Sequence, residues 1–148
     1  MFDFRSDLLE ENTMLKLIIG VKGTGKTKTL INLVNGALEV TKGDVVCIEK
    51  GVKLRYDIKP TARLVNVEEY AIKDAQALYG FVAGILASNH DVTDLFIDST
   101  LKICNEDLEA FEKLVLELDA LLKTIDVNMV MTVSMPEEKV TDTVRKFI

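Results

Sequence analysis

The chain has 148 residues, of which 48% are hydrophobic and 28% are charged, and its formal net charge is −6. This size and composition are typical of one globular domain and exclude extensive disorder. The acidic balance, with a pI near 4.9, disfavours nucleic-acid binding because a polyanion is repelled. The most apolar stretch, residues 77–87, is too short for a membrane span, which needs about 20 residues.

Residues 1–13 show little periodicity and are expected to form a peripheral extension before a domain of residues 14–148. They lack the charged-then-apolar order of a signal peptide. The two cysteines, Cys47 and Cys104, form no CxxC pair, and reduced thiols are expected for them. We therefore expect a cytoplasmic protein.

From residue 15 onward, short apolar runs alternate with helical patterns. The runs predict five strands at residues 15–19, 45–48, 62–67, 95–97 and 127–133. Helices are predicted at 26–40, from a cap at Asp74 to residue 88, from a cap at Asn105 over 106–124, and in a short segment opened by Pro136. The alternation predicts an α/β fold, a three-layer α/β/α sandwich around a mainly parallel five-stranded sheet. Ligands of such sheets bind at the carboxyl ends of the strands.

A phosphate-binding motif follows the first predicted strand. Gly20-Val21-Lys22-Gly23-Thr24-Gly25-Lys26-Thr27 matches G-x-x-x-x-G-K-[ST] at every fixed position, between a strand and a helix. Glycines let such a loop curl its backbone N–H groups around a phosphate, and the following helix adds its dipole. Lys26 would bridge the β- and γ-phosphates, and Thr27 would hold Mg²⁺. These residues and the adjacent Lys28 form the predicted binding set for ATP and Mg²⁺.

Two acidic residues end predicted strands. Asp98 closes the run Leu95-Phe96-Ile97 and is expected to hold Mg²⁺ opposite Thr27. Glu49 ends the second strand and is a candidate general base, with a salt bridge to Lys50 or Lys53 as the structural alternative. Because parallel strands end at one edge, all these residues should lie together. The predicted catalytic set is Lys26, Glu49 and Asp98.

Several further polar residues have weaker predicted roles. Ser134 closes the last strand, where a γ-phosphate contact competes with a solvent-facing serine. Arg55 and Arg63 are possible phosphate contacts, although surface arginines are the simpler interpretation. Residues 41–44 match the guanine-recognition pattern [NT]KxD, but they precede the second strand, whereas GTPases place the motif after a late strand. We therefore expect ATP over GTP.

These motifs identify the chain as resembling the P-loop NTPase superfamily over residues 14–135, in its additional-strand, RecA-like type. In RecA-type ATPases a water-activating glutamate ends the strand after the P-loop helix, which is the position of Glu49. The KLIIG-x-KG-x-GKT and FIDSTLKIC stretches also resemble short clostridial P-loop proteins sometimes labelled twitching-motility ATPases. The acidic and histidine boxes of true twitching-motility ATPases are absent, so pilus retraction is not implied.

Three functions fit these features. The first is a slow or partner-dependent ATPase or nucleotide switch, with an unidentified protein partner or a second copy completing the site. The second is a kinase for a small molecule or nucleotide, for which residues 50–60 are the one candidate lid. The third is a nonhydrolysing interaction module that binds ATP for stability. Ser99, which stands where many additional-strand ATPases have glutamate, weakens the case for ordinary hydrolysis.

Overall fold

The computed structural model describes residues 14–148, and the predicted extension at 1–13 lies outside the described residues. The strands are β1 Leu15–Gly20, β2 Asp44–Glu49, β3 Arg63–Asn66, β4 Val92–Ile97 and β5 Asn128–Ser134. The α-helices are α2 Lys26–Val40, α3 Ala75–Ser88, α4 Thr100–Ile103, α5 Leu108–Leu122 and α6 Asp142–Arg145. Two 3₁₀ turns occupy Val67–Tyr70 and Glu137–Lys139.

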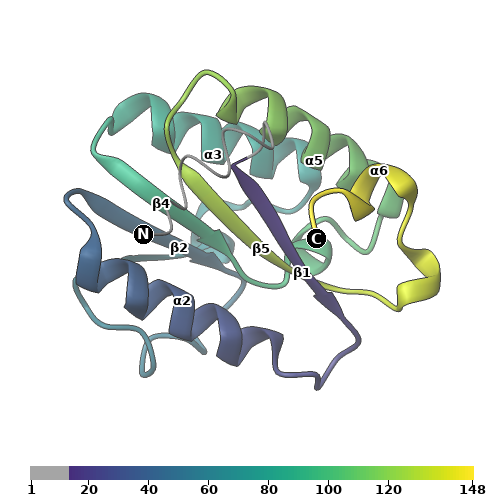
Figure 1. The fold of residues 1–148 in the computed structure, drawn as a ribbon, viewed down its shortest axis with the longest axis horizontal. Coiled ribbons are helices and arrows are strands. Elements are labelled where there is room, and N and C mark those ends of the chain that lie inside the picture. The colour runs from purple at the N-terminus through teal and green to yellow at the C-terminus, as the bar shows by residue number, and fades with distance from the viewer. Residues whose placement is uncertain (1–13) are drawn as a thin grey trace, which may run out of the picture.

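The five strands form one all-parallel sheet in the order β1-β5-β4-β2-β3. The predicted α/β class and three-layer α/β/α sandwich are confirmed, with a fully parallel sheet. Figure 1 shows α2 covering one face, while α3 and α5 cover the other. Because every strand is parallel, the loops after the strands all emerge at the same edge of the sheet.

The burial pattern of β2 explains why both faces are covered. Val45 and Cys47 pack with α2, whereas Val46 and Ile48 belong to the larger core under α3 and α5. Residues alternate between the faces of a strand, so a strand buried on both sides reads as a continuous apolar run. By the same alternation, Glu49 at the end of β2 belongs to the α2 face.

The predicted strands and helices agree with the structure except at their boundaries and in one cap, and the structure adds the short helix α4 and the 3₁₀ turn at Val67–Tyr70, which were not predicted. The helix at 26–40 and the Asp74 cap are confirmed, since the Asp74 carboxylate accepts the Ala77 N–H at 2.8 Å. The cap predicted at Asn105 is wrong, because Asp107 caps α5 by accepting the Ala110 N–H. Asn105 instead lies in a left-handed turn that follows the short helix α4. The sequence did not predict this turn.

The C-terminal segment also differs in detail from the prediction. Pro136 opens only the short 3₁₀ turn, and α6 begins separately at a Thr141 cap. Beyond α6, the Phe147 carbonyl accepts the N–H of Leu17, so the C-terminal segment bonds to the edge strand β1. None of the helices within residues 14–148 combines the length and apolar character needed to cross a bilayer.

Candidate functional site

The glycine-rich loop between β1 and α2 forms the first wall of the site. Gly23 and Gly25 have φ angles of 88° and 84°, in the left-handed region that glycine adopts most readily. Gly20 is needed for a different reason, because a Cβ there would lie 2.6 Å from Thr24 Oγ1. The loop therefore turns tightly enough to bring the Thr24 side chain against Gly20.

Two side chains close the loop internally. Thr24 Oγ1 donates to the carbonyl of Val21 at 2.8 Å, and Lys26 Nζ donates to the same carbonyl at 2.9 Å. The ammonium of Lys26 is thus folded back across the loop. Helix α2 begins at Gly25 without a side-chain cap, and no acidic residue occupies its first turn. An anion placed there would satisfy the free N–H groups and the helix dipole.

Asp98 links this loop to the centre of the sheet. Its carboxylate accepts the hydroxyl of Thr27 at 3.2 Å and that of Thr132 at 2.8 Å, and the residue is 9% exposed. The hydroxyl of Ser99 also donates to it, at 3.2 Å. Thr27 and Asp98, the two residues predicted to hold a metal, are therefore in direct contact. Hydroxyl and carboxylate oxygens are ligands suited to Mg²⁺.

Thr132 is a site residue that the sequence analysis missed. It accepts the Ser99 N–H at 2.8 Å while donating to Asp98, and it is 1% exposed. The only sequence signal is a single hydroxyl residue inside the otherwise apolar run of residues 129–133. Glu49, Asp98 and Thr132 lie in a row across β2, β4 and β5, because Ile48, Ile97 and Met131 are paired in register before them.

Glu49 lies in this row, but its carboxylate points into the following loop. It is 4% exposed and accepts the backbone N–H groups of Lys53 at 3.0 Å and Leu54 at 3.3 Å. Burial raises the pKa of the Glu49 carboxyl, the two backbone hydrogen bonds oppose that rise, and the nearby Asp98 adds to it. Neither of the predicted salt bridges, to Lys50 or Lys53, is formed; Glu49 anchors the loop backbone instead.

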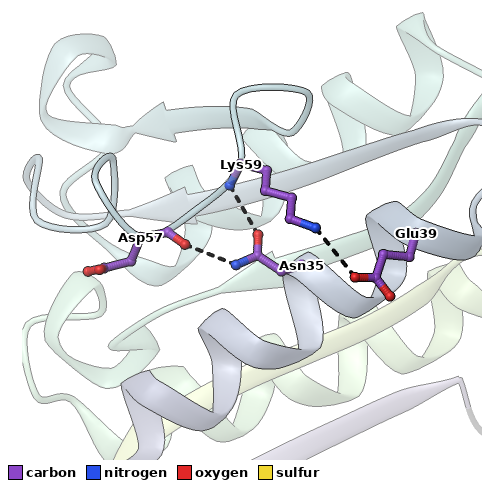
Figure 2. A network of polar contacts seen from close by, with 4 residues as sticks. All are labelled: Asn35, Glu39, Asp57 and Lys59. Atoms are coloured by element: carbon purple, nitrogen blue, oxygen red, sulfur yellow. Dashed lines mark hydrogen bonds and ion pairs between the residues drawn. The ribbon is translucent and has the colours of Figure 1, made fainter.

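The loop at residues 50–60 is also fixed from its other side. Leu54 and Ile58 are buried in the α2-side core, and Asn66 Oδ1 accepts the Gly51 N–H at 2.9 Å. Figure 2 shows Asn35 of α2 clamping the loop: its amide donates to the Asp57 carbonyl and accepts the Lys59 N–H. These contacts make the segment a pinned wall of the site, and a free lid at these residues would have to break them.

These elements surround a cavity of about 510 Å³. It is lined by Lys22, Gly23, Gly25, Lys26, Thr27, Lys28, Lys50, Lys53, Leu54, Asp98, Ser99, Lys102, Glu106, Thr132 and Ser134. Six lysines and only two carboxylates line it, although the whole chain has a net charge of −6. This local reversal of charge favours an anionic ligand.

The predicted site residues divide into two groups. Most of the predicted binding set lines the cavity, as does Ser134, while Gly20, Val21 and Thr24 shape the loop without lining it. Glu49 does not line the cavity.

The two arginines lie away from the cavity. Arg55 is exposed and donates to the hydroxyl of Tyr56. Arg63 lines a separate cavity between β2, β3 and α3.

The guanine-like motif at residues 41–44 lies at the opposite edge of the sheet, before β2. Its Asp44 carboxylate accepts the amide of Asn89 at 2.9 Å, and a Cβ at Gly43 would clash with the Asp91 carbonyl. The motif is therefore explained by the turn into β2, as expected. Within residues 14–148, no three His, Cys, Asp or Glu side chains gather into a metal site of their own.

Comparison with protein-family models and with curated protein sequences finds no match for this chain. The assignment of a function therefore rests on the geometry of the cavity: a curled glycine-rich loop, an uncapped helix start, a hydroxyl–carboxylate pair and an excess of lysines.

Proposed function

We propose that the chain binds ATP with Mg²⁺ in the lysine-lined cavity and acts as a slow or partner-dependent ATPase or nucleotide switch. The observation that carries this proposal is the 3.2 Å contact between Thr27 and Asp98, residues 71 positions apart. It joins the loop suited to phosphates to the carboxylate suited to the metal that phosphates bring.

Magnesium fits the residues present. Thr27 and Asp98 would hold it, and bound nucleotide would supply its remaining ligands other than water, as is usual for this ion. When bound, the metal would neutralise charge between the β- and γ-phosphates. The absence of a closed acidic cluster among residues 14–148 agrees with a site that needs the nucleotide to be complete.

The sheet order supports the additional-strand type of P-loop protein. β5 lies between β1, which carries the loop, and β4, which carries Asp98. Glu49 ends β2 on the far side of β4, where the RecA-like resemblance places a water-activating glutamate. Its carboxylate is held by the Lys53 and Leu54 N–H groups, and release of those bonds would be needed before it contacts water in the cavity. This arrangement favours slow turnover that a partner accelerates.

The kinase alternative loses support at residues 50–60. That segment was the only candidate lid, and it is pinned by Glu49, Asn35, Asn66 and two buried apolar side chains.

A cytoplasmic location is part of the same proposal. Cys47 and Cys104 are free and buried, as a reducing compartment allows, and burial raises the pKa of the Cys104 thiol to about 12.

The first experiment is calorimetry of ATP, GTP and ADP with Mg²⁺ on the wild type, Lys26→Ala and Lys42→Ala. Lys42 is exposed at the opposite edge of the sheet, so Lys42→Ala is a matched control for the lost charge and also tests the guanine-like motif. We expect micromolar ATP binding that is lost in Lys26→Ala and kept in Lys42→Ala. No triphosphate binding by the wild type would contradict the proposal.

Turnover is tested separately by long ADP-release assays. Glu49→Gln should abolish any hydrolysis and leave ATP affinity unchanged if Glu49 is the base, because glutamine can still accept the loop hydrogen bonds. Unchanged turnover in Glu49→Gln would exclude that role. Binding without any ADP release would favour the nonhydrolysing module.

A further inference from the structure

The cavity wall opposite the glycine-rich loop carries three lysines that have no role in the proposed function as described above. Lys50 and Lys53 belong to the loop after β2, and Lys102 belongs to α4. None of the three forms an ion pair or a side-chain hydrogen bond with another residue of the described chain, 14–148. All three residues are exposed, although the charge of Lys53 lies near enough to Glu49 to lower the pKa of that carboxyl.

The position of this wall follows from the order of the strands. Asp98 ends β4, and β2 is the next strand away from β1. Glu49 lies beside Asp98 in the row at the strand ends, about one strand spacing of roughly 4.8 Å away, and Lys50 follows Glu49. Lys102 follows Asp98 by four residues, across the short helix α4. Thr27 and Asp98 would hold the metal, and the three lysines line the same cavity on the Asp98 side.

The backbone that carries Lys50 and Lys53 is fixed before any ligand arrives. Glu49 accepts the Lys53 N–H at 3.0 Å, and Asn66 accepts the Gly51 N–H at 2.9 Å. Only the lysine side chains must become ordered on binding, which lowers the entropic cost of the contact. The buried Glu49 carboxylate thus positions the lysines even while it is withheld from the cavity.

We propose that Lys50, Lys53 and Lys102 form a γ-phosphate subsite, supplied within one chain, that distinguishes a nucleoside triphosphate from a diphosphate. This inference rests on the proposed function and adds to it the residues that read the nucleotide state. The N–H groups of the loop hold the phosphates that ATP and ADP share, while Lys26 reaches both the β- and the γ-phosphate. The three lysines contact only the phosphate that ADP lacks, so their charge separates the two affinities.

The test compares AMP-PNP, which keeps the γ-phosphate and is not hydrolysed, with ADP, both with Mg²⁺ in calorimetry. The variant Lys50→Ala/Lys53→Ala/Lys102→Ala is measured beside Lys42→Ala/Lys113→Ala/Lys139→Ala, which removes the same charge from exposed positions that do not line the cavity. We expect the subsite variant to lose at least about tenfold in AMP-PNP affinity, with ADP affinity changed less than about twofold. The control variant should change neither the AMP-PNP affinity nor the ADP affinity.

Equal losses for both nucleotides would overturn the proposal, because the lysines would then act only through the general potential of the cavity. Unchanged affinities would also overturn it and would make the three residues ordinary surface lysines. Failure of the wild type to bind either nucleotide would instead contradict the proposed function itself. Placing an arginine at one of the three positions of the subsite variant should restore part of the preference for AMP-PNP over ADP, since a positive charge returns to the subsite.

Discussion

The hydroxyl of Thr132 donates to Asp98 Oδ1 at 2.8 Å and accepts the N–H of Ser99 at 2.8 Å. It therefore fixes both the carboxylate proposed to hold a metal and the turn that follows β4. Ser99 has a φ angle of 56°, a left-handed conformation that is uncommon for a residue other than glycine. The hydrogen bond to Thr132 helps to stabilise this turn and keeps Asp98 directed at Thr27.

We expect Thr132→Val to weaken both the fold and the proposed metal site. Valine keeps the shape but leaves the partly buried Ser99 N–H without its acceptor, which costs about 1–3 kcal/mol of unfolding free energy. Urea denaturation measures that loss, and calorimetry with and without Mg²⁺ measures the effect on nucleotide binding. The Mg²⁺-dependent part of ATP affinity should fall while the metal-free part stays. Thr132→Ser, which retains the hydroxyl, should behave like the wild type; equal loss in both variants would contradict this role.

Gly20→Ala should impair ligand binding at the glycine-rich loop more than it impairs folding. The new Cβ would lie 2.6 Å from Thr24 Oγ1 and would displace it from the Val21 carbonyl. Because the loop must shift to make room for the new Cβ, and its N–H groups are proposed to bind phosphate, we expect ATP affinity to fall about tenfold or more. The matched control is Gly36→Ala, in open space on α2, which should raise stability by about 0.5–1 kcal/mol. Unchanged ATP affinity in Gly20→Ala would show that this tight turn is not required.

Glu49 should make stability depend on pH in a specific direction. Its pKa is raised in the folded state above the ordinary 4.5, so the folded chain binds its proton more tightly than the unfolded chain does. Stability from this group is fully present below pH 4.5 and is lost as the pH rises through the folded value. Relative to the wild type, Glu49→Gln should therefore become progressively more stable between pH 4 and 7.

Urea denaturation at pH 4, 5, 6 and 7 measures this trend. Glu117→Gln, at an exposed position on α5, controls for the loss of one negative charge. A Glu49→Gln curve parallel to the wild type across the range would show that burial does not control this carboxylate. Glu49→Ala should be destabilised at every pH, by about 1–3 kcal/mol, because the Lys53 and Leu54 N–H groups lose their acceptor.

The clamp in Figure 2 offers a matched pair of variants in one network. Asn35→Ala removes the hydrogen bonds to the Asp57 carbonyl and the Lys59 N–H. We expect this variant to lose about 1 kcal/mol of unfolding free energy. Glu39→Gln removes only the exposed 3.4 Å ion pair with Lys59, which should change stability by less than about 0.5 kcal/mol. Hydrogen exchange of the Ile58 amide should accelerate in Asn35→Ala alone. Equal exchange in both variants would mean that Asn35 does not hold the loop.

The amino-acid sequence by itself determined the local parts of this protein. The strand, glycine-rich turn and helix of residues 15–40 follow from short-range rules, since glycine adopts the turn most readily and apolar spacing specifies the helix. The layered α/β class follows from the alternation of elements. The cap at Asn105 was wrong because left-handed turns depend on neighbouring segments, such as the Lys73 carbonyl that accepts the Asn105 amide at 2.6 Å.

The tertiary structure alone decided which side chains meet. Strand order and register place Thr132, Asp98 and Glu49 in one row, although they come from three strands far apart in the chain. A hydroxyl residue within the apolar run of residues 129–133 carries no sign of this contact, which is why Thr132 was missed. Glu49 was found as a strand-ending acid, but its use as an anchor for the Lys53 N–H depends on the path of the following loop. Such contacts arise from long-range pairing and from burial of polar groups that must find partners, and neither can be read from neighbouring residues.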